Sequence, residues 1–236
     1  MDGGSVKRLA LIALLASVAA IAGCAPSKSG LLARWNPFYN EDPYDPRQYG
    51  PTIDERVEEI RELARRAPRM SPDERDQVSQ DLGRRLQAET SMAIKLELVR
   101  ALGAFETPMA DTALRMALSD PDPEIRRTAV KAWGRRQSPQ AIQMLSQTLS
   151  SDTDLDVRMA AAAELGNFKD RAAVEALGVA LEDSDPALQL RAIESLRLAT
   201  GRDYGADVAA WRQVVQGGEP TNFERPSIVE RWFKWR

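Results

Sequence analysis

The sequence predicts an all-α protein, an α-solenoid of about four helical pairs with flanking helices and extended tails. Three observations favour this architecture. Leucines recur in columns spaced 31 or 32 residues apart, a basic residue recurs with nearly the same spacing, and a capping residue followed by proline marks many helix starts. Repetition at a fixed period of roughly 20–50 residues indicates stacked units that each bury their apolar face against a neighbour.

The first segment is typical of a secretory signal. Lys7 and Arg8 precede an uncharged apolar run over residues 9–22, and Ile21-Ala22-Gly23-Cys24 closes this run with the only cysteine of the chain. The run is too short to cross a hydrocarbon core of about 30 Å, which takes roughly 20 apolar residues. A basic start, a short apolar core and small residues before a cleavage site together describe an export signal.

The four residues that end at Cys24 resemble the lipobox of bacterial lipoproteins. The resemblance implies that residues 1–23 are a cleaved lipoprotein signal peptide and that Cys24 carries acyl chains such as palmitate, more than one of which is needed for stable anchoring. Ala25 stands where an inner-membrane retention signal would usually have Asp, which favours the periplasmic face of the outer membrane. An ordinary secretory signal cut elsewhere and an uncleaved anchor are the alternatives, and both leave an unpaired cysteine unexplained.

Two segments precede the repeats. Residues 24–52 are rich in Pro, Tyr, Asn and Asp and have no helical period, so we expect an extended tether that carries the lipid anchor. Residues 53–70 are expected to hold an N-terminal flanking helix, because Ile53, Val57 and Ile60 share one helical face. Pro68 ends that pattern, since the residue before a proline is disfavoured in a helix.

Residues 71–200 carry the repeats. Four columns run through four units: Leu82, Leu114, Leu145 and Leu177; Leu86, Leu118, Leu149 and Leu181; Lys95, Arg126, Arg158 and Arg191; and Leu102, Trp133, Leu165 and Leu198. The two leucine columns are four residues apart, which places them on one helical face. Each unit therefore presents an apolar face that only stacking can bury.

Each unit is expected to hold two helices. Ser71-Pro72-Asp73-Glu74 is a capping box, and the pairing of an N-cap residue with proline recurs at Thr107-Pro108, Asp122-Pro123, Ser138-Pro139 and Asp185-Pro186. The pattern predicts first helices near 72–87, 108–119, 139–150 and 170–182, and second helices near 91–102, 123–136, 155–166 and 186–199. The glycines that follow three second helices are expected at C′ positions with positive φ: Gly103, Gly134 and Gly166.

The second helices carry a resemblance to a known family. Asp122-Pro123-Glu124-Ile125-Arg126, Asp154-Leu155-Asp156-Val157-Arg158 and Asp185-Pro186 through Arg191 place an acid at the inner turn and an arginine four to six residues later. With units of 31–33 residues, this region resembles HEAT repeats, in particular the short bacterial units of the PBS lyase type. The resemblance implies a concave surface lined by second helices. It also implies a ladder of charges that joins adjacent units through Asp122, Arg126, Asp154, Arg158, Asp185 and Arg191.

The chain after the repeats divides into two parts. Residues 201–218 are expected to form a capping helix that places Val208 and Trp211 against the end of the stack. Residues 219–236 form an aromatic and basic tail with Trp232, Phe233 and Trp235 near its end. Two interpretations of these aromatic residues are open: docking on a partner or in the solenoid groove, which we favour, and contact with lipid headgroups.

Composition excludes several classes of function. The chain has no histidine, which excludes Ser-His-Asp and Cys-His catalysis and a Cys/His zinc site. Its formal charge is −3, whereas nucleic-acid binding calls for a basic domain. The spacing of Asp152, Asp154 and Asp156 matches the first ligand positions of an EF-hand calcium loop. Val157 and Ala163, however, replace the glycine and the glutamate that this loop needs at its sixth and twelfth positions. We expect no catalytic residue, no metal, no cofactor and no small-molecule substrate.

Three arginine pairs are further candidates for binding: Arg65-Arg66, Arg84-Arg85 and Arg135-Arg136. Cations near the end of a helix are favoured by the helix dipole, so a solvated helix face is the default interpretation. The sharper hypothesis is that arginines lining a groove bind an acidic partner, because arginine is enriched at interfaces.

These features predict a non-enzymatic, lipid-anchored scaffold that is exported and binds an unidentified protein partner in the bacterial cell envelope. Two alternatives stay open. One is a structural component that links the membrane to other envelope layers. The other is a lyase-like chaperone or an enzyme subunit, which follows from the occurrence of such repeats in bilin lyases.

Overall fold

A computed structural model describes residues 50–220, and every regular element within this range is helical. Several predictions concern residues outside this range: the signal peptide predicted over residues 1–23, the predicted lipidation of Cys24, nearly all of the predicted tether, and the proposed contacts of Trp232, Phe233 and Trp235. The predicted all-α solenoid is confirmed, with ten α-helices and one short 3₁₀ helix in the described range.

The helices follow one another as a flanking helix, four pairs and a final helix. The flanking helix α3 spans Ile53–Arg66 and continues into the 3₁₀ helix η2 at Ala67–Arg69. The four pairs are α4 (Pro72–Ala88) with α5 (Met92–Leu102), α6 (Pro108–Ala117) with α7 (Pro123–Gly134), α8 (Pro139–Ser151) with α9 (Leu155–Leu165), and α10 (Arg171–Ala180) with α11 (Pro186–Thr200). The last helix is α12 (Val208–Val215).

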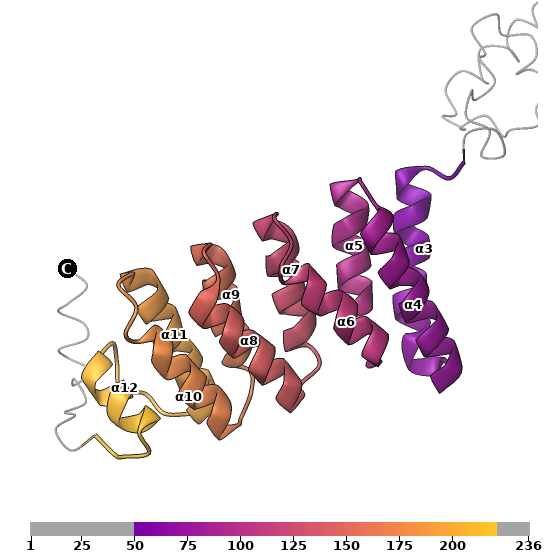
Figure 1. The fold of residues 1–236 in the computed structure, drawn as a ribbon. Helices are drawn as coiled ribbons and strands as arrows, with labels where there is room; N and C mark the ends of the chain where they lie inside the picture. The colour runs from indigo at the N-terminus through magenta and orange to yellow at the C-terminus, as the bar shows by residue number, and fades with distance from the viewer. Residues whose placement is uncertain (1–49, 221–236) are drawn as a thin grey trace, which may run out of the picture. The chain divides into compact units, whose positions relative to one another are not determined.

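The helices form two layers (Figure 1). The layer of first helices contains α4, α6, α8, α10 and α12, and the layer of second helices contains α3, α5, α7, α9 and α11. Helix α3 packs on α5 in the way that each second helix packs on the next. The flanking helix therefore extends the layer of second helices by one member, and α12 extends the layer of first helices at the other end.

Local capping fixes where the helices begin. The Ser71 hydroxyl accepts from the Glu74 amide at 3.3 Å, and the Glu74 carboxylate accepts from the Ser71 amide at 2.8 Å. Thr52 and Glu55 form the same capping box at the start of α3. Each box satisfies two amide groups that have no partner within the helix, which is why the predicted starts agree with the structure.

One apolar core runs between the two layers. Leu82, Leu114, Leu145 and Leu177 are completely buried, and so is Trp133. The prediction that Leu198 continues the column of Leu102, Trp133 and Leu165 is wrong. Leu198 is 52% exposed, and Leu196 is buried in its place. Leu196 lies at the same distance from its N-cap Asp185 as Trp133 does from Asp122. The fourth unit therefore has no inserted residue, and its register matches that of the other units.

The prediction of positive φ at three glycines is wrong. Gly103 and Gly166 have φ values of −61° and −59°, and Gly134 is the last residue of α7. These glycines lie where the next second helix comes close. A Cβ atom on Gly103 would lie 3.0 Å from the Ala132 Cβ, and one on Gly166 would lie 2.9 Å from the Ser195 Cα. They are needed for close packing between helices, which the sequence pattern alone does not distinguish from a turn.

Candidate functional site

The three aspartates of the predicted ladder cap helices. The side chains of Asp122, Asp154 and Asp185 accept from the amides of Glu124, Val157 and Ala187 at 2.8, 3.1 and 2.8 Å, respectively. A carboxylate at this position satisfies a free amide and also interacts favourably with the helix dipole. In the structure, these aspartates serve their own helices and do not pair with the arginines of the basic column.

The basic column pairs with a second set of aspartates. Arg126 donates to Asp152 through Nε at 2.8 Å and through Nη2 at 2.9 Å, and Arg158 lies 3.8 Å from Asp183. Lys95 lies 4.0 Å from Asp120. Each of these pairs joins one unit to the next. The ladder therefore uses the aspartates that stand two residues before the N-caps: Asp120, Asp152 and Asp183.

Arg191 lies outside this ladder. Its guanidinium pairs with Glu194 at 2.9 Å on the exposed surface of α11. Gln189 takes the corresponding place, because its amide donates to the Asp183 carbonyl at 2.8 Å, as Arg158 donates to the Asp152 carbonyl at 3.1 Å. Since no further unit follows α11 in the described residues, a residue here has no next aspartate to reach. The neutral side-chain amide of Gln189 is sufficient to bind the Asp183 carbonyl.

The Arg126–Asp152 pair is the most buried of the three pairs in the ladder and has the shortest distances. Their side chains are only 13% and 7% exposed. Burial alone would raise the pKa of Asp152, but the hydrogen bonds from Arg126 and from the Asp154 amide outweigh it, so the pKa is lowered. The folded protein therefore holds Asp152 ionised, and this pair contributes stability that depends on pH.

We expect Arg126→Gln to lower the free energy of unfolding by about 1.5 kcal/mol at pH 7, because glutamine can keep a bond to a backbone carbonyl but loses the charged pair. The lowered pKa of Asp152 contributes stability above the unfolded-state pKa of about 4, and this contribution is lost as the pH falls through the folded-state pKa. Urea unfolding at pH 7 and at acidic pH values should therefore show the difference between wild type and variant shrinking below about pH 4. A difference that stays constant would contradict this assignment.

The arginine pairs divide into buried and exposed members. Arg136 is buried: its guanidinium binds Asp111 and the carbonyls of Leu102 and Phe105, and it lies 4.8 Å from the centre of the Trp133 ring. Arg135 is exposed, and its side chain has no hydrogen bond or ion pair to another described residue. Of the three pairs in the sequence, this one combines a structural arginine with an arginine free to bind.

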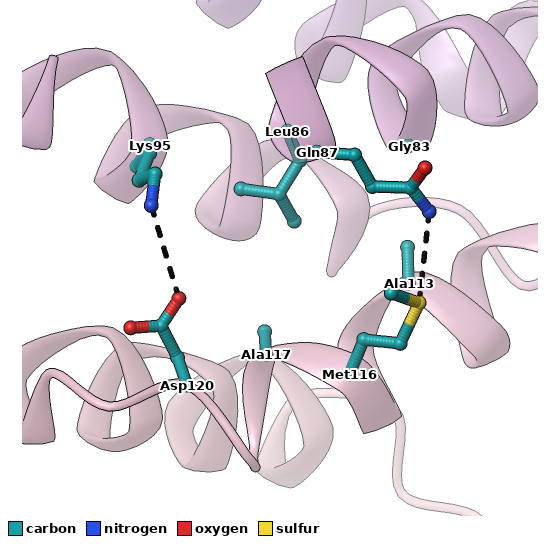
Figure 2. Close-up of a pocket in the computed structure, with 8 residues that line it drawn as sticks. All are labelled: Gly83, Leu86, Gln87, Lys95, Ala113, Met116, Ala117 and Asp120. Atoms are coloured by element: carbon teal, nitrogen blue, oxygen red, sulfur yellow. Dashed lines mark hydrogen bonds and ion pairs between the residues drawn. The ribbon is translucent and has the colours of Figure 1, made fainter. Parts of the chain in front are cut away.

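A groove separates α4 and α6 in the layer of first helices. It has a volume of about 240 Å³, and Figure 2 shows its lining residues: Gly83, Leu86, Gln87, Lys95, Ala113, Met116, Ala117 and Asp120. The Lys95–Asp120 pair closes one end, and the Gln87 amide lies 3.6 Å from the Met116 sulfur at the other. The walls between them are mostly apolar. Such a groove could hold an apolar side chain, and the two titratable residues in its lining, Lys95 and Asp120, are paired with each other.

A second pocket, of about 230 Å³, lies in the layer of second helices between α3, α5 and the end of α7. Four arginines and one glutamate surround two alanines in its lining: Arg61, Arg65, Arg100, Arg135, Glu97, Ala64 and Ala101. The arginine pairs in the sequence include Arg65 and Arg135, but no sequence pattern points to the other charged residues of the lining. Arg61 and Glu97 are 36 residues apart, and no pattern in the sequence connects them.

The repeat architecture agrees with the comparison with known families. Residues 79–163 and 142–210 match the family model of HEAT repeats, and the two matches together cover more than half of the chain. The chain belongs to the HEAT repeat family. No curated protein matches it. The matched residues run from α4 to α12, so the ladder and the second-helix layer from α5 onward are part of the HEAT array.

Residues 50–220 contain no group of three or more acidic, cysteine or histidine side chains placed to hold a metal ion. Within the same range, no helix combines the length and the apolar character needed to cross a membrane.

Proposed function

We propose that this protein is a non-catalytic, lipid-anchored scaffold that binds a protein partner in the bacterial cell envelope, with the outer membrane as the favoured location. The observation that supports it best is the layer of second helices. Five helices, α3, α5, α7, α9 and α11, lie side by side over residues 53–200. HEAT repeats form extended surfaces of this kind, and a stack of helices is well suited to contacting another protein over several units.

The exposed face of this layer supports a binding role. Along α7 it carries Lys131 and Arg135, and along α11 it carries Leu190 and Leu198, which are 50% and 52% exposed. Exposed leucines and exposed cations on one layer of helices fit a protein interface, where apolar contacts and charged groups occur together. The catalytic alternative, an enzyme subunit or a lyase-like chaperone, would be supported by measured turnover in the purified protein.

The anchor is tested by fractionation. We expect Cys24→Ala to move most of the protein from the membrane pellet to the soluble fraction, because without the cysteine no acyl chain can be attached. Quantitative immunoblotting of the two fractions measures this shift. Ala25→Asp is the matched control, and it should stay in membranes, since it changes only the proposed sorting residue. Cys24→Ala protein that remains in the pellet would contradict the lipoprotein proposal.

The scaffold role is tested by crosslinking the tagged, anchored protein in intact cells and identifying partners after solubilisation. A stoichiometric protein partner supports the proposal. If no protein is captured while the anchored protein co-sediments with the sacculus after detergent treatment, the structural alternative that links the membrane to another envelope layer is favoured instead.

A further inference from the structure

We infer that the arginine-lined pocket between α3, α5 and α7 is the point at which the scaffold binds carboxylate side chains of an acidic segment in its protein partner. This inference rests on the proposed function and adds to it the place of contact and the chemistry of the partner. It is carried by the arrangement of charges in the pocket, where four arginines face one glutamate.

Glu97 positions two of the arginines. Its side chain is only 10% exposed, and it accepts from Arg61 Nε at 3.3 Å, from Arg61 Nη2 at 2.8 Å and from Arg100 Nη1 at 2.6 Å. The hydrogen bond from Arg61 is the main reason why the pKa of Glu97 is lowered, so the carboxylate stays ionised. One negative charge therefore holds two guanidinium groups, which leaves a net positive charge with N–H donors to spare.

Arg135 adds a positive charge that nothing in the described range neutralises by direct contact. It enters the pocket from the end of α7, and its side chain forms no hydrogen bond or ion pair with another residue between 50 and 220. Ala64 and Ala101 contribute only methyl groups to the lining, so the space between the guanidinium groups is not filled by a side chain. An incoming carboxylate can thus reach Arg100 and Arg135 without displacing a packed residue.

The acids around the pocket limit what can bind. Arg65 is held by Glu58 at 2.6 Å and by Glu62 at 2.7 Å, and both acids are exposed. Glu164 of α9, the second helix that follows α7, interacts electrostatically with Arg135 and Lys131, although burial raises the pKa of its carboxyl group. A long polyanion such as a nucleic acid would meet these acids as well as the arginines. A short segment with one or two carboxylates fits the positive area between them, and the planar guanidinium group matches a carboxylate with two parallel bonds.

The test uses two labelled peptides and three forms of the detergent-solubilised full chain. One peptide carries glutamates spaced by alanines, and in the other each glutamate is replaced by glutamine. Arg135→Glu reverses the unpaired charge of the pocket. Arg115→Glu is the matched control, since Arg115 is exposed in α6 of the other layer and its side chain also has no hydrogen bond or ion pair among the described residues. Binding is measured by fluorescence anisotropy at low ionic strength.

We expect the glutamate peptide to bind wild type and Arg115→Glu equally, and to bind Arg135→Glu at least fivefold more weakly. The glutamine peptide should not bind. Equal losses in the two variants would indicate non-specific attraction and overturn the inference. Inorganic polyphosphate that binds more tightly than the peptide, with the same loss in Arg135→Glu, would assign the pocket to phosphate ligands and also overturn it.

The same variants separate this inference from the function on which it rests. If wild type captures a protein partner by crosslinking and Arg135→Glu captures it equally well, the scaffold stands and the pocket is not its contact. If wild type captures no protein but binds the glutamate peptide as expected, the pocket stands and the scaffold proposal fails.

Discussion

Replacing Arg136 with alanine is expected to lower the free energy of unfolding by about 3 kcal/mol. The Arg136 side chain is only 4% exposed, and it binds Asp111 and the carbonyl oxygens of Leu102 and Phe105. Alanine would leave a carboxylate that is 20% exposed without its cation and two carbonyls without a donor. Removing one partner of a buried charged pair costs about 3–5 kcal/mol, and the partial exposure of Asp111 places this site at the lower end.

Arg135→Ala is the control for this prediction, because it removes an arginine from the adjacent position. Its side chain is exposed and makes no hydrogen bond with another residue in the range 50–220, so the unfolding free energy of the variant should stay within about 0.5 kcal/mol of wild type. Urea titrations followed by circular dichroism at 222 nm measure both variants. Equal losses in the two variants would mean that the contacts of Arg136 with Asp111, Leu102 and Phe105 do not stabilise the junction between the first and second pairs.

The features that sequence analysis predicted correctly are set by local chemistry. The helix starts depend on a capping side chain and a nearby amide, as at Ser71 and Glu74, and these groups lie three residues apart. The burial of Leu82, Leu114, Leu145 and Leu177 depends on a period that the sequence repeats. In a stack where each unit contacts only its neighbours, most contacts join residues no more than about 35 positions apart in the sequence. The fold class could therefore be predicted from the repeat pattern.

The errors arise where two units meet. The ladder aspartates Asp120, Asp152 and Asp183 also repeat, at intervals of 32 and 31 residues, so a signal for them exists in the sequence. This signal is difficult to separate from that of the N-cap aspartates two residues later, because the ladder column and the N-cap column have the same residue type and nearly the same period. The assignment of Arg191 failed for a different reason. The basic column placed Arg191 six residues after Asp185, although Arg126 and Arg158 lie four residues after their N-cap aspartates, whereas Gln189 and Leu196 keep the spacing of the earlier units.

The pocket between α3, α5 and α7 could be anticipated only in part. Arg65 and Arg135 could be proposed as binding residues because each belongs to a pair of adjacent arginines. Arg100 and Glu97 have no such pattern, and the sequence gives no reason to distinguish them from other charged residues on a helix surface. What makes them a site is that α3 packs beside α5 and brings Arg61 to Glu97. Helix α3 lies before the repeats and outside their periodicity, so its place in the layer of second helices cannot be deduced from the repeat pattern.

Gly166→Ala is expected to lower the free energy of unfolding by about 2 kcal/mol. The added Cβ would lie 2.9 Å from the Ser195 Cα and 3.1 Å from its carbonyl oxygen, and these backbone atoms of α11 cannot move without shifting the helix. Inserting a methyl group into such a contact typically costs about 1–3 kcal/mol. Strain in φ is not the cause, since Gly166 has a φ of −59° that alanine adopts readily.

Gly83→Ala makes the same chemical change where there is room for it, and we expect the opposite sign. Gly83 lies inside α4, and its added Cβ would meet only the Ala113 Cβ at 3.5 Å, an ordinary contact distance. Alanine should therefore stabilise the protein by about 0.5–1 kcal/mol, because glycine is the poorer helix former and loses more chain entropy on folding. Thermal and urea unfolding of the two variants compare the signs directly. If Gly166→Ala were also stabilising, close approach between second helices would not be the reason for glycine after α9, and the same explanation for Gly103 would have to be abandoned.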